Sequence, residues 1–201
     1  FFSIAALVIL SVSSTFAQEV SVGLRGGVNF STLQGKDVEG LDYATGLDIA
    51  LPVELSFSKN FALQPELHFI QKGAAIKYEA EGVENEIRAF QNYLELPILL
   101  KGKIGNDKIS GYAIAGPTLG YALSQRGVLI EGDDKTSDSV DFTDEQNRFE
   151  IGANFGLGAE LQAGLGKVVV DARYGLGLSG LTKSDDLAEG VNNEFNSGIA
   201  V

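Results

Sequence analysis

Apolar and polar side chains alternate along seven segments of ten or more residues. From Val20 to Phe30 every second residue is apolar or glycine, and the residues between them are polar or glycine. Successive side chains leave a pleated strand on opposite sides, so this period of two predicts β-strands. Such lengths suit a bilayer crossing of about 9–11 tilted residues, whereas the mean globular strand has about 5–6. The predicted strands are 20–33, 44–57, 61–78, 90–104, 109–125, 147–163 and 167–178, with an eighth beginning near Phe195.

The connections between these strands alternate in length. Three are tight turns rich in glycine and asparagine, which tolerate the positive φ of turns, at 58–60, 105–108 and 164–166. Four are long and polar, at 34–44, 79–91, 126–147 and 179–194. The long connections hold 18 acidic and 5 basic residues in a chain of net charge -12. Outer-membrane barrels have short periplasmic turns and long extracellular loops. We therefore predict an all-β fold, an eight-stranded antiparallel up-and-down transmembrane β-barrel with acidic loops at the cell surface.

Alternation alone does not say which side of each strand faces inward. A soluble lipocalin-like barrel or sandwich would bury the apolar side chains, whereas a membrane barrel presents them to lipid. The polar positions favour the membrane barrel, because they are rich in glycine, which a crowded interior requires, and mix both charge signs. We expect Leu24, Leu96 and Phe155 to contact lipid and paired charges to fill the lumen. This predicted structural network comprises Arg25, Asp48, Glu54, Glu66, Lys72, Glu95, Lys101, Lys103, Glu160, Asp171 and Arg173.

The charged interior has two functional interpretations. An eight-stranded barrel is only wide enough for side chains to fill, which favours a structural plug. The alternative is a narrow path for transport or a secretion-accessory role. Catalysis finds little support: His68 is the only histidine, the chain has no cysteine, and no serine lies in a nucleophile elbow. Glu66, on the same strand face, could pair with His68. We predict a non-enzymatic protein without a cofactor or a bound metal.

Two local motifs suggest ligands but fit their patterns poorly. Residues 175–180 satisfy G-x-G-x-x-G, yet two of the glycines fall inside a predicted strand and no helix follows. Residues 131–145 are rich in carboxylates, but their spacing misses the EF-hand order, so a solvated loop is the better interpretation. Acidic loops repel nucleic acid, which we exclude as a partner, and they could hold a protein partner.

The two ends of the chain and its prolines add further expectations. Residues 1–17 form an apolar run that ends in small residues, which predicts an export signal peptide incomplete at its N-terminus. The barrel domain is then 18–201, and we expect its last strand to be truncated. Each proline inside a predicted strand removes a ladder donor and predicts a bulge or a bent register there. These prolines are Pro52, Pro65, Pro97 and Pro117.

Several stretches together resemble a known family, the PorT-like "porin family" of small outer-membrane β-barrels. They are residues 23–31, 63–67, 71–73, 92–98, 115–117, 120–121, 156–158 and 171–174. The resemblance implies an eight-stranded antiparallel barrel in the outer membrane of a Gram-negative cell. It also implies contact with outer-membrane lipid and with the barrel-assembly machinery during insertion, and it offers no catalytic residues to transfer. Family members end in a strand with a terminal aromatic residue, and this chain differs by ending at Val201.

Overall fold

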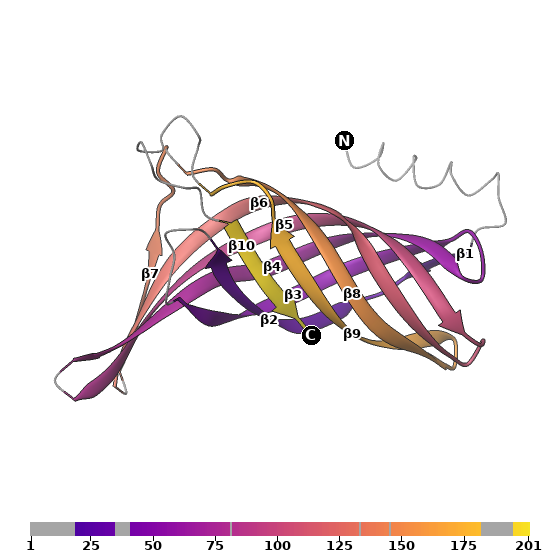
Figure 1. The fold of residues 1–201 in the computed structure, drawn as a ribbon, viewed down its shortest axis with the longest axis horizontal. Helices are drawn as coiled ribbons and strands as arrows, with labels where there is room; N and C mark the ends of the chain where they lie inside the picture. Colours follow the sequence, from indigo (N-terminus) through magenta and orange to yellow (C-terminus); the bar gives the residue numbers. More distant parts are fainter. Residues whose placement is uncertain (1–18, 35–40, 81, 133, 145, 182–194) are drawn as a thin grey trace.

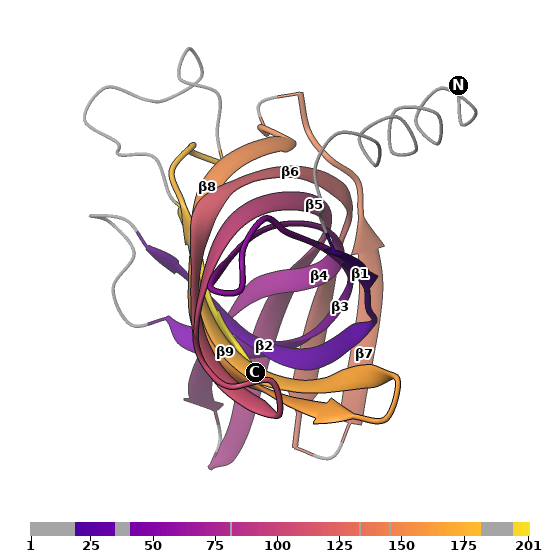
Figure 2. The same cartoon turned by 90° about the vertical axis from the view of Figure 1, so that its right-hand side faces the viewer.

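A computed structural model describes residues 19–34, 41–80, 82–132, 134–144, 146–181 and 195–201. One antiparallel sheet curls into a barrel, as the view along the barrel in Figure 2 shows. Its strands are β1 (Glu19–Val22), β2 (Arg25–Gln34), β3 (Asp42–Ser56), β4 (Phe61–Ala80), β5 (Val83–Gly105), β6 (Ile109–Glu131), β7 (Asp134–Val140), β8 (Phe149–Ala163), β9 (Gly166–Gly177) and β10 (Phe195–Ala200). Within the described ranges, no helix has the length and apolar character that a membrane crossing requires. The predicted export segment lies outside these ranges.

The strand pairings give a barrel of eight strands. Strands β1 and β2 run along β3 in one register and form a single barrel strand, interrupted where the Gly23 amide donates to the Pro52 carbonyl. Strand β10 lies between β9 and β2 and closes the ring, and β3 also pairs with β4. Strand β7 pairs with β6 outside this ring. The predicted eight-stranded antiparallel up-and-down barrel is confirmed.

The apolar side chains of the strands cover the outer wall. Leu24, Leu96 and Phe155 are 77%, 42% and 49% exposed, whereas Glu95, the neighbour of Leu96, is buried. A wall of exposed leucine, isoleucine and phenylalanine would be unfavourable in water but suits lipid tails. The prediction that the apolar positions face outward is therefore confirmed. The alternative, a soluble barrel with these side chains in its core, is wrong.

Alternation of apolar and polar side chains is weak along the sequence of β6. Its lumen-facing positions include Tyr112 and Ile114, which pack with Leu99 of β5 in a small apolar cluster inside the barrel. Large apolar groups therefore occur on both sides of β6. Sequence hydropathy cannot separate the two sides of such a strand.

Two of the four segments predicted to be long loops are mostly β-strand, so these two loop predictions are wrong. Segment 79–91 is the end of β4 and the start of β5, joined by a turn in which Gly82 has φ 78°. Segment 126–147 contains the end of β6 and all of β7. Charged side chains led to the loop prediction, but a strand ladder is made by backbone groups and tolerates charge where both faces meet water. Segments 35–40 and 182–194 of the other two predicted loops lie outside the described residues.

As a result, a four-stranded sheet of β4, β5, β6 and β7 extends beyond the barrel mouth. Figure 1 shows it at the left, at the opposite end from the tight turns. The tight turns at the other end join β3 to β4, β5 to β6 and β8 to β9, as predicted.

The prolines do not shift the strand register. Pairing has the same offset on either side of all four, and the register shifts lie between Tyr43 and Asp48 and between Asn92 and Tyr93. The predicted bulges at the prolines are therefore wrong. Proline removes one donor from the ladder, but its carbonyl still accepts, as that of Pro52 does.

Candidate functional site in the charged lumen

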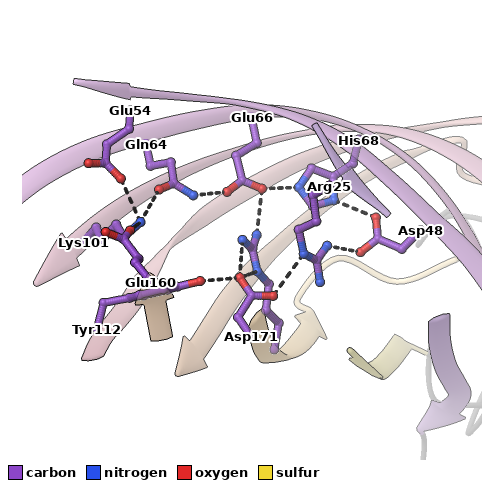
Figure 3. Close-up of polar contacts among 11 residues, drawn as sticks. Arg25, Asp48, Glu54, Gln64, Glu66, His68, Lys101, Tyr112, Glu160 and Asp171 are labelled. Atoms are coloured by element: carbon purple, nitrogen blue, oxygen red, sulfur yellow. Dashed lines mark hydrogen bonds and ion pairs between the residues drawn. The ribbon is translucent and has the colours of Figure 1, made fainter. Parts of the chain in front are cut away.

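The charged side chains selected from the sequence all lie on lumen-facing positions of the barrel strands. They form two clusters with additional polar residues. The turn-side cluster consists of Arg25, Asp48, Glu54, Gln64, Glu66, His68, Lys101, Lys103, Tyr112, Glu160, Asp171 and Arg173; Figure 3 labels all of them except Lys103 and Arg173. The loop-side cluster consists of Lys72, Tyr93, Glu95, Glu150 and Asn196. Two of the eleven predicted network residues, Lys72 and Glu95, thus lie apart from the other nine.

Two arginines link carboxylates at the centre of the turn-side cluster. Arg25 forms ion pairs with Asp48 and, at 3.0 Å, with Asp171. Arg173 lies 2.7 Å from Glu66 and 2.8 Å from Asp171, which therefore contacts both arginines. Asp171 and Arg173 are two residues apart in β9, so their side chains lie on the same face of the strand and meet. Each arginine donates to two carboxylates, an arrangement that its fork of donors allows.

His68 lies between two carboxylates on neighbouring strands. Its Nδ1 is 3.1 Å from Asp48 of β3, and its Nε2 contacts Glu66 of β4. A neutral imidazole has one donor nitrogen, whereas the imidazolium donates from both. The imidazolium is therefore the form that satisfies both contacts. The contact between Glu66 and His68 is the one that the sequence suggested.

Lys101 organises the end of the turn-side cluster that is nearer the tight turns. Its ammonium donates to Glu54 at 2.8 Å and to Gln64 at 3.1 Å, contacts Glu160, and lies 4.1 Å from the centre of the Tyr112 ring. The Gln64 amide in turn donates to Glu66. Gln64 thus connects the lysine end to the arginine centre, and Figure 3 shows the unbroken chain of contacts.

The loop-side cluster is smaller and centres on Lys72. Its ammonium lies 2.6 Å from Glu95, contacts Glu150, and lies 5.0 Å from the centre of the Tyr93 ring. Asn196 of β10 donates to Glu150 at 2.6 Å and to the Tyr93 hydroxyl at 3.2 Å. The last barrel strand is therefore tied into the lumen by a side chain as well as by its ladder.

Sequence reasoning missed several members of these clusters. Each lies on the polar side of a predicted strand or is a tyrosine on a lumen-facing position, so period-two counting carries the signal for most of them. Tyr112 was missed because the pattern of its strand is mixed and does not say which side faces the lumen. The missed residues are Gln64, Tyr93, Tyr112, Glu150 and Asn196.

Glycines leave room for the large side chains of the lumen. A Cβ added at Gly158 of β8 would overlap the Tyr112 ring, and one at Gly156 would lie 3.0 Å from Cγ of Arg173. Both glycines belong to the polar side of β8, which was expected to fill a crowded interior. The tyrosine hydroxyl can therefore reach Asp171, to which it donates at 2.7 Å.

The segment after β7 covers the inner wall at the loop end. Phe142 packs against Ile70, Tyr93 and Ala122 inside the barrel mouth. Arg148 lies 4.5 Å from the centre of the Phe142 ring, and it donates to the carbonyl of Ala122. Part of the predicted loop 126–147 therefore folds onto the barrel. In the part of this acidic segment that the structure describes, no group of carboxylates is arranged to hold a metal ion.

The free space in the lumen is uneven. Where the two clusters meet, a cavity of about 30 Å³ is lined by residues of both, among them His68 and Lys72, which leaves room for about two water molecules. A larger space of about 820 Å³ lies at the turn end, between β1–β2 and β9, which are not paired with each other. It is lined by lumen groups such as Glu54 and Lys101 and also by the outward-facing Val22 and Val170, so it opens through the wall there. The middle of the barrel is thus filled mainly by side chains.

A closed sheet with an apolar outer wall and paired charges inside defines an integral membrane β-barrel. The chain belongs to the family described as outer membrane protein beta-barrel domain, whose model matches residues 16–183. It is therefore an outer-membrane barrel protein. None of the curated proteins matches the chain.

Solved structures with a similar fold include two other small bacterial barrels. The attachment invasion locus protein Ail of Yersinia pestis is 12% identical, with 92% of this chain and 95% of that chain covered and a TM-score of 0.43. In its complex with the heparin analogue sucrose octasulfate, the same protein is 11% identical, with 92% of this chain and 96% of that chain covered and a TM-score of 0.41. Neisserial surface protein A is 10% identical, with 90% and 95% covered and a TM-score of 0.45. With TM-scores below 0.5, these likenesses carry no weight for function.

Proposed function

We propose that the protein is a non-enzymatic outer-membrane barrel whose lumen is plugged by its own side chains and whose acidic sheet β4–β7 is displayed at the cell surface. The observation that carries this proposal is a pair of contacts that cross the lumen from β4 to the far wall. Arg173 of β9 contacts Glu66 of β4 at 2.7 Å, and Glu150 of β8 contacts Lys72 of β4. A solute path along the axis would have to break these contacts. The barrel therefore serves as an anchor for the extracellular sheet.

Energetics support a plug more than a gate. Removing one partner from a buried ion pair costs about 3–5 kcal/mol, because the other charge stays buried without compensation. Each arginine of the turn-side cluster holds two carboxylates, so opening the lumen would disrupt at least two pairs at once. At about 3–5 kcal/mol for each disrupted pair, thermal fluctuations rarely open such a network.

Single-channel recording in planar bilayers tests the plug. We expect no stable current from the purified, refolded protein over a range of voltages. The matched positive control replaces Arg25 and Arg173 with alanine, which removes the two central cations and should produce current if the barrel still folds. Stable conductance steps from the unchanged protein would contradict the proposal.

A second candidate function is a transport or protein-secretion accessory role. The observation in its favour is the space of about 820 Å³ at the turn end, which is lined by charged groups and could receive a solute or a peptide from the periplasm. Solute-dependent conductance would favour this candidate.

Several finer features belong to the same proposal. The resemblance of residues 92–98 and 171–174 supports a PorT-like member of the barrel family, exported by residues 1–17 and inserted by the barrel-assembly machinery. We propose no cofactor, outer-membrane lipid around the barrel, and a protein partner rather than nucleic acid at the acidic surface. Mass spectrometry of the mature protein tests the export step, with Gln18 as the expected first residue.

A further inference from the structure

The extracellular sheet has two faces of different chemistry. Directly paired residues of neighbouring strands share a face. One row of such pairs runs Ile76–Ile87–Leu129–Thr136, and the next runs Tyr78–Asn85–Glu131–Asp134. We call this the apolar–acidic face. Its members are Ala74, Ile76, Tyr78, Val83, Asn85, Ile87, Ala89, Gly127, Leu129, Glu131, Asp134, Thr136 and Asp138.

Large apolar side chains on this face are open to solvent. Ile76, Tyr78, Val83 and Ile87 are between 40% and 47% exposed. Ile76 and Ile87 are a direct cross-strand pair, so their exposed surfaces adjoin. Contiguous exposed apolar surface of this kind marks interaction sites in soluble surroundings.

Lipid does not account for this exposure. Strand β4 has 20 residues, about twice the length that a bilayer crossing requires, and its last part extends beyond the barrel mouth (Figure 1). The apolar–acidic face also continues the lumen side of β4 and β5, since Lys72 and Gln91 form the next row toward the barrel after Ala74 and Ala89. The lipid-facing wall is on the other side of these strands.

The charges of the apolar–acidic face have one sign. Among the residues just assigned to it, Glu131, Asp134 and Asp138 are acidic and none is basic. The opposite face differs in both respects: Phe90 and Val128 are buried there against Ala44 at the barrel rim, and Arg88 pairs with Glu86 at 2.6 Å. On the opposite face, the large apolar side chains are therefore covered and Arg88 is paired. On the apolar–acidic face, the small Ala74 and the polar Asn85 are buried, whereas the large apolar side chains are exposed beside acidic residues.

We propose that the apolar–acidic face binds a cationic amphipathic peptide segment. The apolar side chains of such a segment would cover Ile76, Tyr78 and Ile87, and its lysines or arginines would lie against Asp134 and Asp138. A second copy of this chain would bring the same acidic charges, and nucleic acid has the wrong sign, so charge complementarity favours the cationic peptide. The inference rests on the proposed function, since the sheet must be accessible at the cell surface.

Binding is measured by fluorescence anisotropy with the full chain in nanodiscs of phosphatidylcholine. The labelled ligand is a short peptide of alternating lysine and valine, and empty nanodiscs give the lipid background. We expect the double variant Ile76→Thr with Ile87→Thr to weaken binding about tenfold, a loss of about 1.4 kcal/mol. We expect Asp134→Asn with Asp138→Asn to weaken it about threefold at low salt, with a smaller effect at high salt.

The matched control is Glu79→Gln with Glu84→Gln, a directly paired acidic couple on the opposite face. It removes the same charge and should leave the affinity unchanged. Comparison peptides of lysine with serine and of glutamate with valine should bind at least tenfold more weakly than the lysine–valine peptide. Equal affinity for the lysine–serine peptide, or equal loss in the two acidic double variants, would overturn the proposal. Self-association of the protein in place of peptide binding would also overturn it.

A separate readout distinguishes failure of this inference from failure of the proposed function. An epitope inserted at Gly132 should be labelled on intact cells if the sheet is displayed outside. Labelling without peptide binding contradicts only the inference. Peptide binding in nanodiscs without labelling of cells contradicts the surface display.

Discussion

Strands β4, β5 and β6 each pass through two regions whose surroundings differ. In the barrel, their apolar side chains face outward and their charges are buried in pairs, as Leu96 and Glu95 illustrate. In the sheet that extends beyond the barrel mouth, one side covers an apolar cluster with Phe90, and the other leaves Ile87 exposed. The same alternation thus separates lipid from lumen in one region and a covered face from an open face in the other. A strand pattern is interpreted only once the medium on each side is known.

The two regions also differ in how they use charge. In the lumen, Arg173 is buried and shared between two carboxylates. In the sheet, Arg88 has one partner and its side chain is 32% exposed. Buried pairs are costly to break, whereas exposed pairs contribute little. Substitutions that remove these charges should therefore have very different effects.

The largest effect is expected from Arg173→Met in the turn-side cluster. It leaves Glu66 and Asp171 short of a buried cation and should lower the free energy of unfolding by about 3–5 kcal/mol. Urea unfolding of the barrel refolded in lipid vesicles measures this. The control Arg126→Met removes an arginine that lies 5.2 Å from the Phe90 ring in the sheet and should cost less than about 1 kcal/mol. Similar losses in the two variants would contradict the contrast between the regions.

An intermediate effect is expected where glycine makes room for the lumen side chains. Gly158→Ala places a methyl group against the Tyr112 ring and should cost about 1–3 kcal/mol by overpacking. Gly127→Ala in the sheet is the control, since a Cβ there meets no atom within 4 Å. The same unfolding assay should show the control within about 0.5 kcal/mol of the unchanged protein. A harmless Gly158→Ala would mean that Tyr112 is not held against β8.

The smallest effect is expected from the ion pair of the sheet. The hydrogen bond from Arg88 lowers the pKa of Glu86 below its ordinary value of 4.5. The pair therefore stabilises the β4–β5 hairpin above that value, and the contribution is lost as the pH falls through the lowered pKa. Its size is about 0.2–1 kcal/mol. Hydrogen exchange of the hairpin amides should show faster local opening at acidic pH, and Arg88→Gln should remove that pH dependence. An unchanged pH profile in Arg88→Gln would show that the pair contributes nothing.

Much of the barrel could be predicted from the sequence because its strands have two distinct surroundings. Lipid on one side and a neutralised lumen on the other impose strict alternation, and Leu94, Leu96 and Ile98 display it over a whole crossing. The same rule identified the lumen charges by position. It could not divide them into two clusters, because the stagger between strands decides whether Lys72 of β4 lies level with Glu95 of β5 or with a carboxylate such as Glu160 of β8.

The sheet beyond the barrel mouth could not be predicted in the same way. Both faces of the sheet meet water in part, so charged residues such as Glu84 and Glu86 are tolerated within strands and resemble a loop. Phe90 is large and apolar but lies on the side opposite Ile87, because it packs on the barrel rim. Its burial depends on a contact with Ala44, far away in the sequence, which no local pattern reports.

Both the fold and the proposed plug require lipid to contact the apolar wall while the charges are sealed inside. The chain has no cysteine, so single cysteines can be introduced for spin labels in lipid vesicles. Labels at Leu96 and Leu157 should collide freely with dissolved oxygen and be shielded from a water-soluble nickel chelate, whereas a label at Thr136 of the sheet should show the reverse. Immobile labels at Leu96 and Leu157 that neither reagent reaches, or labels there that the nickel chelate reaches readily, would contradict the account.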